Sequence, residues 1–146
     1  MRKPHLKDIA ELSVTMRQED KDEIWHLARV SPGDALRAAY EACDYNRVVL
    51  MDGKVVCMFG VGGEKGGVGI PWMLASDLLK KIRKPFVREC KEFLKEMSQD
   101  YTLLYNIAWT KNEEHIKWLK WLGFDFGIPE PMGPDGEYYI KFSKVI

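Results

Sequence analysis

A short basic cluster near the middle of the chain has the composition of a phosphate-binding site. Lys80, Lys81, Arg83 and Lys84 follow closely after the apolar segment Val68–Leu74. Ammonium and guanidinium groups form charge-assisted hydrogen bonds with phosphate oxygens. Runs of like charge more often form a solvated surface. The sequence therefore leaves two interpretations of this cluster: a phosphate site or an exposed basic face.

Thiol and metal chemistry have little support in the sequence. The cysteines and histidines are widely spaced, without a CxxC, HxxxH or HExxH pattern, at Cys43, Cys57, Cys90, His5, His26 and His115. We expect the cysteines to be small buried apolar side chains in a reducing compartment. We predict no metal site.

The N-terminal third predicts three helices. Apolar side chains recur at helical spacing in residues 8–16 and 18–29. The second of these segments begins with acidic residues and ends at Arg29, as the helix dipole favours. Ser31 and Pro32 open a third helix, which we expect to reach about Cys43.

Strands follow. The β-branched run 47–51 leads through Asp52-Gly53, a strong hairpin signal, into a returning strand at 54–61. A glycine-rich loop at 62–67 then precedes a third strand, Val68–Leu74. These three segments predict an antiparallel meander.

The rest of the chain alternates between helices and strands. We expect helices at 76–82, from Pro85 to about Met97, and at 112–122, and strands at 101–109, 124–127 and 138–142. Ser76 is a predicted helix cap, Thr110 to Glu113 have capping-box spacing, and Gly123 should end the last helix. The whole predicts one α+β domain over residues 1–146, with a mixed, mostly antiparallel central sheet flanked by helices.

Residues 112–124 resemble a known motif. Their sequence, NEEHIKWLKWLGF, is similar to the Asn-x-x-Ala-x-x-x-Tyr-x-x-x-Gly-Phe signature of the GNAT N-acetyltransferase superfamily. The predicted element order resembles that fold along nearly the whole chain, and residues 2–9 resemble its first strand and helix. A more specific likeness is to GNAT-like internal virion proteins of short-tailed bacteriophages. It rests on Met16–Asp20, Asp52-Gly53, Trp72-x-x-Ala75-x-Asp77, Phe86 and Ile116–Phe124.

The resemblance implies that acetyl-CoA would bind at a splayed pair of central strands. Its pyrophosphate would lie on a glycine-rich turn at the start of the next helix, where backbone N–H groups are free to bind anions. Carried over to this chain, the cofactor-binding residues would be Trp72, Met73, Leu74, Lys80, Lys81, Arg83, Lys84 and Asn112. Asn112 could equally be a helix-capping side chain.

Three of the family's determinants are absent. Residues 75–85 contain no glycine, and Asp77 places a negative charge near the expected phosphate. The family's tyrosine acid corresponds to Leu119, and losing a positioned acid costs on the order of 10²- to 10⁴-fold in rate. The strand Val68–Leu74 has no glutamate to act as a base. We therefore predict no catalytic residues and no cofactor, with acetyl-CoA bound only if the protein is active.

Composition excludes other classes of protein. The chain has 22 Lys and Arg against 22 Asp and Glu, and this zero net charge argues against a dedicated nucleic-acid binder. We also expect no membrane span, since no window reaches the roughly 18 apolar residues that one needs. The polar N-terminus lacks a secretory signal.

The tryptophans allow a prediction about the surface. Trp118 and Trp121 widen the apolar arc of the helix at 112–122. An arc this wide should leave one indole partly exposed, and exposed aromatic residues favour protein interfaces. The alternative is that all five tryptophans lie in the core.

Two functions from different classes follow. In the first, the chain is a phage virion-associated protein, made in the host bacterial cytoplasm, which keeps the fold but has a degenerate acyl-CoA site. It would be a structural or interaction module that contacts other phage virion proteins. In the second, it is an active acetyl-CoA-dependent N-acetyltransferase. The absent glycine turn and Leu119 favour the first.

Overall fold

The computed structural model describes residues 1–43, 45–63 and 66–146, and the side chains of residues 83–85 and 87 also lie outside this description. Its helices are α1 (Leu6–Thr15), α2 (Gln18–Ala28), α3 (Pro32–Ala42), the 3₁₀ helix η1 (Asp77–Lys81), α4 (Arg83–Met97) and α5 (Glu113–Trp121). Its strands are β1 (Tyr45–Met51), β2 (Lys54–Gly63), β3 (Val68–Ala75), β4 (Leu103–Trp109), β5 (Asp125–Phe126), β6 (Glu130–Met132) and β7 (Glu137–Val145).

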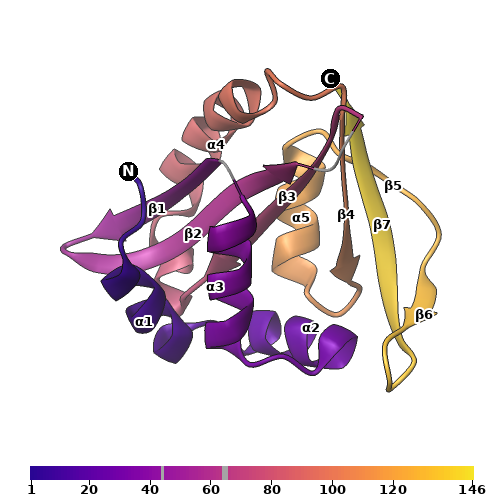
Figure 1. Cartoon of the computed structure of the whole chain (residues 1–146), viewed down its shortest axis with the longest axis horizontal. Helices are drawn as coiled ribbons and strands as arrows, with labels where there is room; N and C mark the ends of the chain where they lie inside the picture. Colours follow the sequence, from indigo (N-terminus) through magenta and orange to yellow (C-terminus); the bar gives the residue numbers. More distant parts are fainter. Residues whose placement is uncertain (44, 64–65) are drawn as a thin grey trace.

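The described strands form one mixed sheet in the order β1-β2-β3-β4-β7-β5, with β6 paired to β7 (Figure 1). β1, β2 and β3 make the predicted antiparallel meander. β4 and β7 are also antiparallel. The one parallel neighbour pair among the described strands is β3 with β4, and its register covers only Val68 with Leu103 and Gly69 with Leu104. The predicted α+β class with a mostly antiparallel sheet is confirmed.

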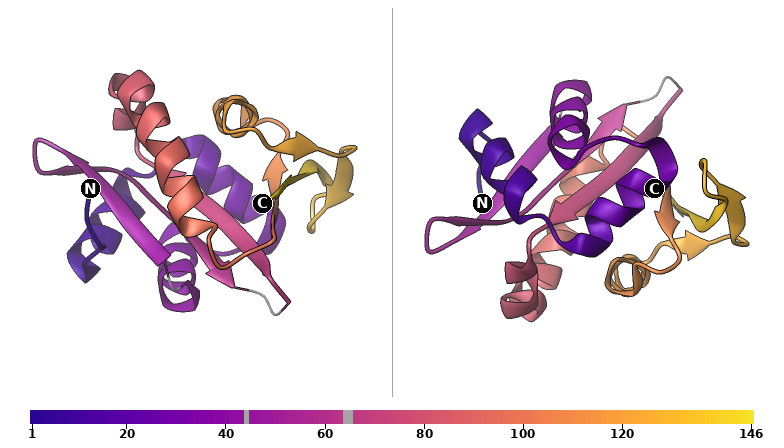
Figure 2. Two further views of the ribbon diagram at one scale, coloured as in Figure 1. Left: turned by 90° about the horizontal axis from the view of Figure 1, so that it is seen from above. Right: turned by 90° about the horizontal axis from the view of Figure 1, so that it is seen from below.

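Helices cover both faces of the sheet. Figure 2 shows α4 on one side and α1 and α3 on the other. Phe86 of α4 and Leu119 of α5 pack with Phe59 of β2 in one core, whereas Leu12 and Leu36 pack with Met58 in the other. Because successive side chains of a strand point to opposite faces, β2 contributes to both cores.

Several element boundaries differ from the sequence prediction. β2 continues to Gly63, so the predicted loop 62–67 begins later, and Glu64 and Lys65 lie outside the described residues. Arg2 makes a single bridge with Val48 rather than the strand that the resemblance implied. β6 forms between the predicted strands 124–127 and 138–142, where the sequence predicted no strand. Its residues pair with β7 as a short hairpin, with Met132 opposite Glu137 and Glu130 opposite Tyr139.

Gly123 ends α5 as predicted. Its φ of 91° lies in the left-handed region, which glycine adopts without strain. Its N–H donates to the Lys120 carbonyl at 3.1 Å, and the next residue, Phe124, returns the chain to the core. This corner fixes how α5 lies against the sheet.

We predict that Gly123→Val lowers the free energy of unfolding by about 1–3 kcal/mol, since a β-branched residue is strained at this φ. Gly127→Val is the matched control, because Gly127 has no positive φ and a Cβ there would meet Lys141 only at 3.8 Å. Urea unfolding of both variants measures the difference. Equal stabilities would contradict the role given to Gly123.

Candidate functional site

The splay between β3 and β4 is the feature around which the candidate site is built. Parallel strands that diverge leave facing backbone groups without partners, and buried groups of this kind must be satisfied elsewhere. Asn106 of β4 provides the first substitute: its Nδ2 donates to the Pro71 carbonyl of β3 at 2.7 Å. One side-chain amide thus replaces a ladder hydrogen bond where the strands begin to separate.

Two carboxylates from α2 accept hydrogen bonds from backbone N–H groups at the far ends of β3 and β4. Asp20 Oδ2 accepts the N–H of Ala75, the last residue of β3, at 2.9 Å. Glu23 Oε1 accepts the N–H of Trp109, the last residue of β4, at 2.7 Å. Asp20 and Glu23 lie on one face of α2 because they are three positions apart. α2 therefore closes the open end of the splay.

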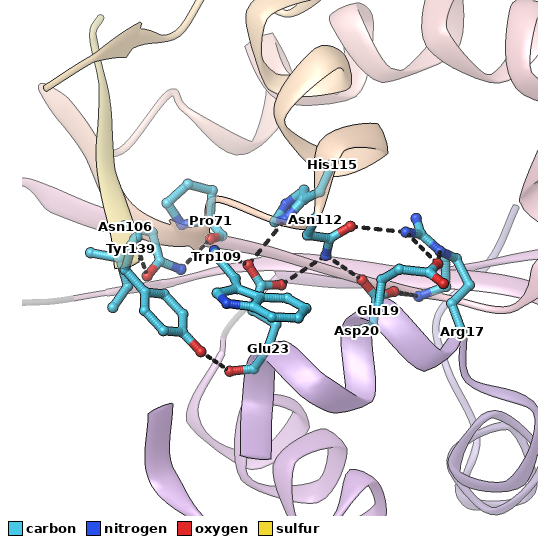
Figure 3. A network of polar contacts seen from close by, with 12 residues as sticks. Arg17, Glu19, Asp20, Glu23, Pro71, Asn106, Trp109, Asn112, His115 and Tyr139 are labelled. Carbon is cyan, nitrogen blue, oxygen red and sulfur yellow. Dashed lines mark hydrogen bonds and ion pairs between the residues drawn. The ribbon is translucent and has the colours of Figure 1, made fainter. Parts of the chain in front are cut away.

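Asn112 joins these groups from the other side (Figure 3). Its Nδ2 donates to Asp20 Oδ1 at 2.9 Å and to Glu23 Oε2 at 3.2 Å. Its Oδ1 accepts from Arg17 Nη2 at 2.9 Å. Asn112 is fully buried, and its side chain makes no cap for α5. The capping interpretation of Asn112 is therefore wrong, as is the capping box from Thr110, since α5 begins after Asn112.

Further contacts hold α2 in place over the splay. The Arg17 N–H donates to the Ala75 carbonyl at 2.8 Å, and the Arg17 side chain also pairs with Glu19 at 3.0 Å. The buried Tyr139 hydroxyl of β7 donates to the Glu23 carbonyl. We call Arg17, Asp20, Glu23, Asn112 and His115 the splay network.

Burial and charge shift the protonation equilibria in the splay network. Burial raises the pKa of Asp20, with Arg17 opposing the shift. For His115, burial opposes protonation, but the Glu23 carboxylate outweighs it and the pKa of His115 is raised. His115 Nδ1 lies 3.5 Å from Glu23 Oε1, which is long for a hydrogen bond. The contact is therefore mainly electrostatic.

The predicted cofactor residues of β3 divide between the two faces of the sheet. Met73 points toward α4 and α5 and lines a hollow of about 170 Å³, together with Phe86, Lys80 and Trp118. We call this the Lys80 hollow. Leu74 and Trp72 pack with the N-terminal helices, and Trp72 Nε1 donates to Cys43 Sγ. Phe86 and Trp118 lie parallel, with ring centroids 6.2 Å apart.

Only Lys80 and Lys81 of the predicted basic cluster have described side chains. Both lysines are exposed on the 3₁₀ helix η1, and Lys80 also lines the Lys80 hollow. The side chains of Arg83 and Lys84 lie outside the described residues. Asn112 and Met73 lie near the splay, so the structure brings together only part of the predicted set.

Sequence reasoning missed the charged members of the splay network. Asp20 and Glu23 belong to the acidic start of the helix predicted at 18–29, yet both are buried. The segment Met16–Asp20 contributed to the resemblance, but no role followed from it. The only local signal was the acidic start of α2, which also fits a helix dipole. Their shared side-chain partner, Asn112, is 92 positions from Asp20 and 89 from Glu23.

The comparison with known proteins identifies a family to which this chain is similar in sequence. The family model described as "Bacteriophage T7, probable scaffold protein Gp13" matches residues 47–128, more than half of the chain. The chain belongs to this family. No curated protein sequence matches it. The matched region runs from β1 past β5 and includes the splayed strands and α5.

Solved structures give the fold. The ribosomal-protein-alanine N-acetyltransferase of Brucella melitensis is 12% identical, with 99% of this chain and 98% of that chain covered and a TM-score of 0.73. A GNAT-family acetyltransferase of Streptococcus pneumoniae is 15% identical, with coverages of 99% and 97% and a TM-score of 0.64. RimL, solved in complex with coenzyme A, is 7% identical, with coverages of 99% and 92% and a TM-score of 0.69. Such identities show the GNAT fold alone.

Two negative findings accompany the site. Among the described residues, no group of three or more His, Cys, Asp and Glu side chains could hold a metal ion. In the same part of the chain, the helices are too short or too polar to cross a membrane.

We predict that Asn112→Ala lowers the free energy of unfolding by at least about 3 kcal/mol, because three buried charged groups lose a hydrogen-bond partner. The control is Gln18→Ala, which removes only an exposed hydrogen bond to Asp22 in the same helix and should cost less than about 0.5 kcal/mol. Urea unfolding compares them. Similar losses in the two variants would contradict a structural role for the splay network.

We also predict that stability falls as the pH rises through the folded-state pKa of His115. A raised pKa means that the folded state binds the proton more tightly, so this stabilisation is complete below the ordinary value near 6.5 and is lost above the folded value. The raised pKa of Asp20 also makes the stability fall as the pH rises, but in a lower pH range. Unfolding measured between about pH 6 and pH 9 should show the decline. The decline in stability should be smaller in His115→Gln. An unchanged dependence of stability on pH in this variant would contradict the assignment of the decline to His115.

Proposed function

We propose that this chain is a virion-associated phage protein with a degenerate acyl-CoA site, and that it is a structural or interaction module. Its family match makes it a phage protein, and its fold is that of the GNAT acetyltransferases. The resemblance to internal virion proteins of short-tailed phages supports the proposal that the protein is part of the phage particle. The splay network is the observation that carries the proposal.

The splay network supports the loss of the cofactor site because its side chains already bind the backbone groups of β3 and β4 that an acyl-CoA would be expected to use. An acyl-CoA arm between the strands would need the backbone at their open ends. Here Asp20 and Glu23 already accept the N–H groups of Ala75 and Trp109. Displacing either carboxylate would leave a buried charge short of partners, at about 1–3 kcal/mol or more for each group.

The turn after β3 also favours a degenerate site. The Ser76 N–H donates to the Val56 carbonyl, and the Leu78 N–H donates to the Ser76 hydroxyl. Both N–H groups therefore have internal partners where a pyrophosphate would need donors. Asp77 follows directly, and its negative charge opposes phosphate binding.

The position of the general acid leads to the same proposal. Leu119 is buried in the core and has no proton to donate. The buried Tyr139 hydroxyl is engaged with the Glu23 carbonyl. Tyr105 lies on β4 and is partly exposed, but nothing in the described contacts directs it toward the splay. We therefore assign this protein no catalytic residue and no cofactor.

The proposed setting follows from the family. The protein would be made in the host bacterial cytoplasm and would bind other phage virion proteins. Equal numbers of acidic and basic residues disfavour direct binding to nucleic acid. Mass spectrometry of purified particles of the encoding phage tests this setting, and absence of the protein from the particles would contradict it.

We predict that acetyl-CoA binds no more tightly than about 100 μM, a binding free energy near −5.5 kcal/mol. Isothermal titration calorimetry on the purified protein measures this value. A dissociation constant in the low micromolar range would instead favour the alternative, an active N-acetyltransferase. In that case, replacing Lys80, Lys81, Arg83 and Lys84 with Gln should abolish binding if this basic cluster holds the phosphates.

Leu119→Tyr tests the same proposal through catalysis. The substitution restores the family's acid in sequence, but we expect no turnover of acetyl-CoA because the splay and the turn stay occupied. A thermal melt controls for damage from placing a hydroxyl in the core. Robust turnover by this variant would show that a cofactor site had been intact.

A further inference from the structure

Trp121 is an exposed indole at the end of α5. Half of its surface is accessible, and Lys91 of α4 places its ammonium 3.8 Å from the ring centroid. The side chain therefore lies between the two helices rather than within either core. Large exposed aromatic side chains of this kind are typical anchors of protein interfaces.

Trp121 separates two depressions on this face. On one side is the Lys80 hollow. On the other is a groove of about 630 Å³ between α4, the end of α5 and the end of β7. We call this the Lys91 groove. Leu94, Leu122 and Ile146 supply its apolar wall, and its volume lies in the range of sites that take several side chains.

The charges around Trp121 are strongly biased. The described residues that line the two depressions include five lysines, the buried Arg17 and two glutamates: Lys80, Lys91, Lys95, Lys117 and Lys144 against Glu92 and Glu114. One glutamate, Glu92, lies 3.8 Å from Lys95. The chain as a whole has a net charge of zero. This face is therefore a local basic surface around an aromatic centre, and its complement is acidic and apolar.

We propose that the α4–α5 face binds an acidic segment of a partner protein, with an apolar side chain of that segment in the Lys91 groove against Trp121. This inference rests on the proposed role as an interaction module. Carboxylates of the segment would pair with Lys91 and Lys95 at the rim of the groove. An amphipathic helix fits such a groove, because its apolar residues recur on one face while its acidic residues point to the rim.

The observations favour a peptide over a nucleic acid. Bases bind aromatic residues by stacking on the ring face, and here the Lys91 ammonium lies over the face of Trp121. The apolar part of the groove is formed by the aliphatic side chains of Leu94, Leu122 and Ile146, which suit a leucine or phenylalanine better than a sugar-phosphate backbone. An oligonucleotide is therefore the competing outcome in the test.

Trp25 is a matched internal control. It is 49% exposed, against 50% for Trp121, and Arg29 lies 5.1 Å from its ring centroid. It belongs to α2 and lines neither of the two depressions. The two tryptophans thus share their exposure and a cation over the ring. Trp121 differs because it lies beside the Lys91 groove, which has an apolar wall and lysines at its rim.

Fluorescence anisotropy of a labelled synthetic helix tests the proposal. The probe is a peptide of roughly 15 residues with Leu at i, i+4 and i+7 and Glu at the polar positions. Its counterparts are the same peptide with Gln for Glu, and a labelled oligothymidylate of similar length. We expect the Glu peptide to bind at least about tenfold more tightly than the other two probes. We also expect its affinity to fall as the salt concentration is raised.

Variants locate the binding. Two variants should each weaken binding of the Glu peptide by at least about tenfold: Trp121→Ser, and the double variant Lys91→Glu with Lys95→Glu. Trp25→Ser should leave the affinity for this peptide unchanged. Thermal melts check folding, and the lysine variants keep the test valid if Trp121→Ser unfolds. Equal binding of the Glu and Gln peptides, equal loss in the two Trp variants, or tighter binding of the oligothymidylate would overturn the proposal. Acetyl-CoA calorimetry is independent of these outcomes, so the proposed function can fail or survive separately.

Discussion

The divergence of two parallel strands is the constraint on which the rest of this structure depends. β3 and β4 pair over two residues each in the described chain and then separate, which leaves buried backbone groups without sheet partners. The chain supplies replacements from other elements: the Asn106 amide, the Asp20 carboxylate and the Glu23 carboxylate. Unsatisfied buried groups cost so much that the position of α2 follows from this requirement.

The same contacts join distant parts of the sequence. Asn112 of the C-terminal half binds Arg17, Asp20 and Glu23 of the N-terminal half, and Tyr139 of β7 donates to the Glu23 carbonyl. A network of buried charges is stable only when every member keeps its partners. It therefore holds α2 and α5 against the sheet through contacts whose loss would leave buried charges without partners.

In the proposed function, a fold that hosts acetyltransferases is kept without its chemistry. The GNAT neighbours share less than a fifth of their residues with this chain, and their likeness carries the architecture rather than an activity. In the proposed function, side chains fill the place of a ligand. The surface is then available for another purpose, and the basic face around Trp121 is the clearest candidate for it.

The sequence by itself determined the local elements and the class of fold. Helical periodicity, the Asp52-Gly53 hairpin and the glycine at 123 act over a few residues, so the three N-terminal helices, the meander and the end of α5 were all predictable. The tertiary structure alone decided which charges are buried. Asp20 and Glu23 follow the pattern of a solvated helix face, and Asn112 that of a helix cap. The hydrogen bonds that join Asn112 to Asp20, Glu23 and Arg17 span 89 to 95 positions of the chain, and no local pattern encodes that separation.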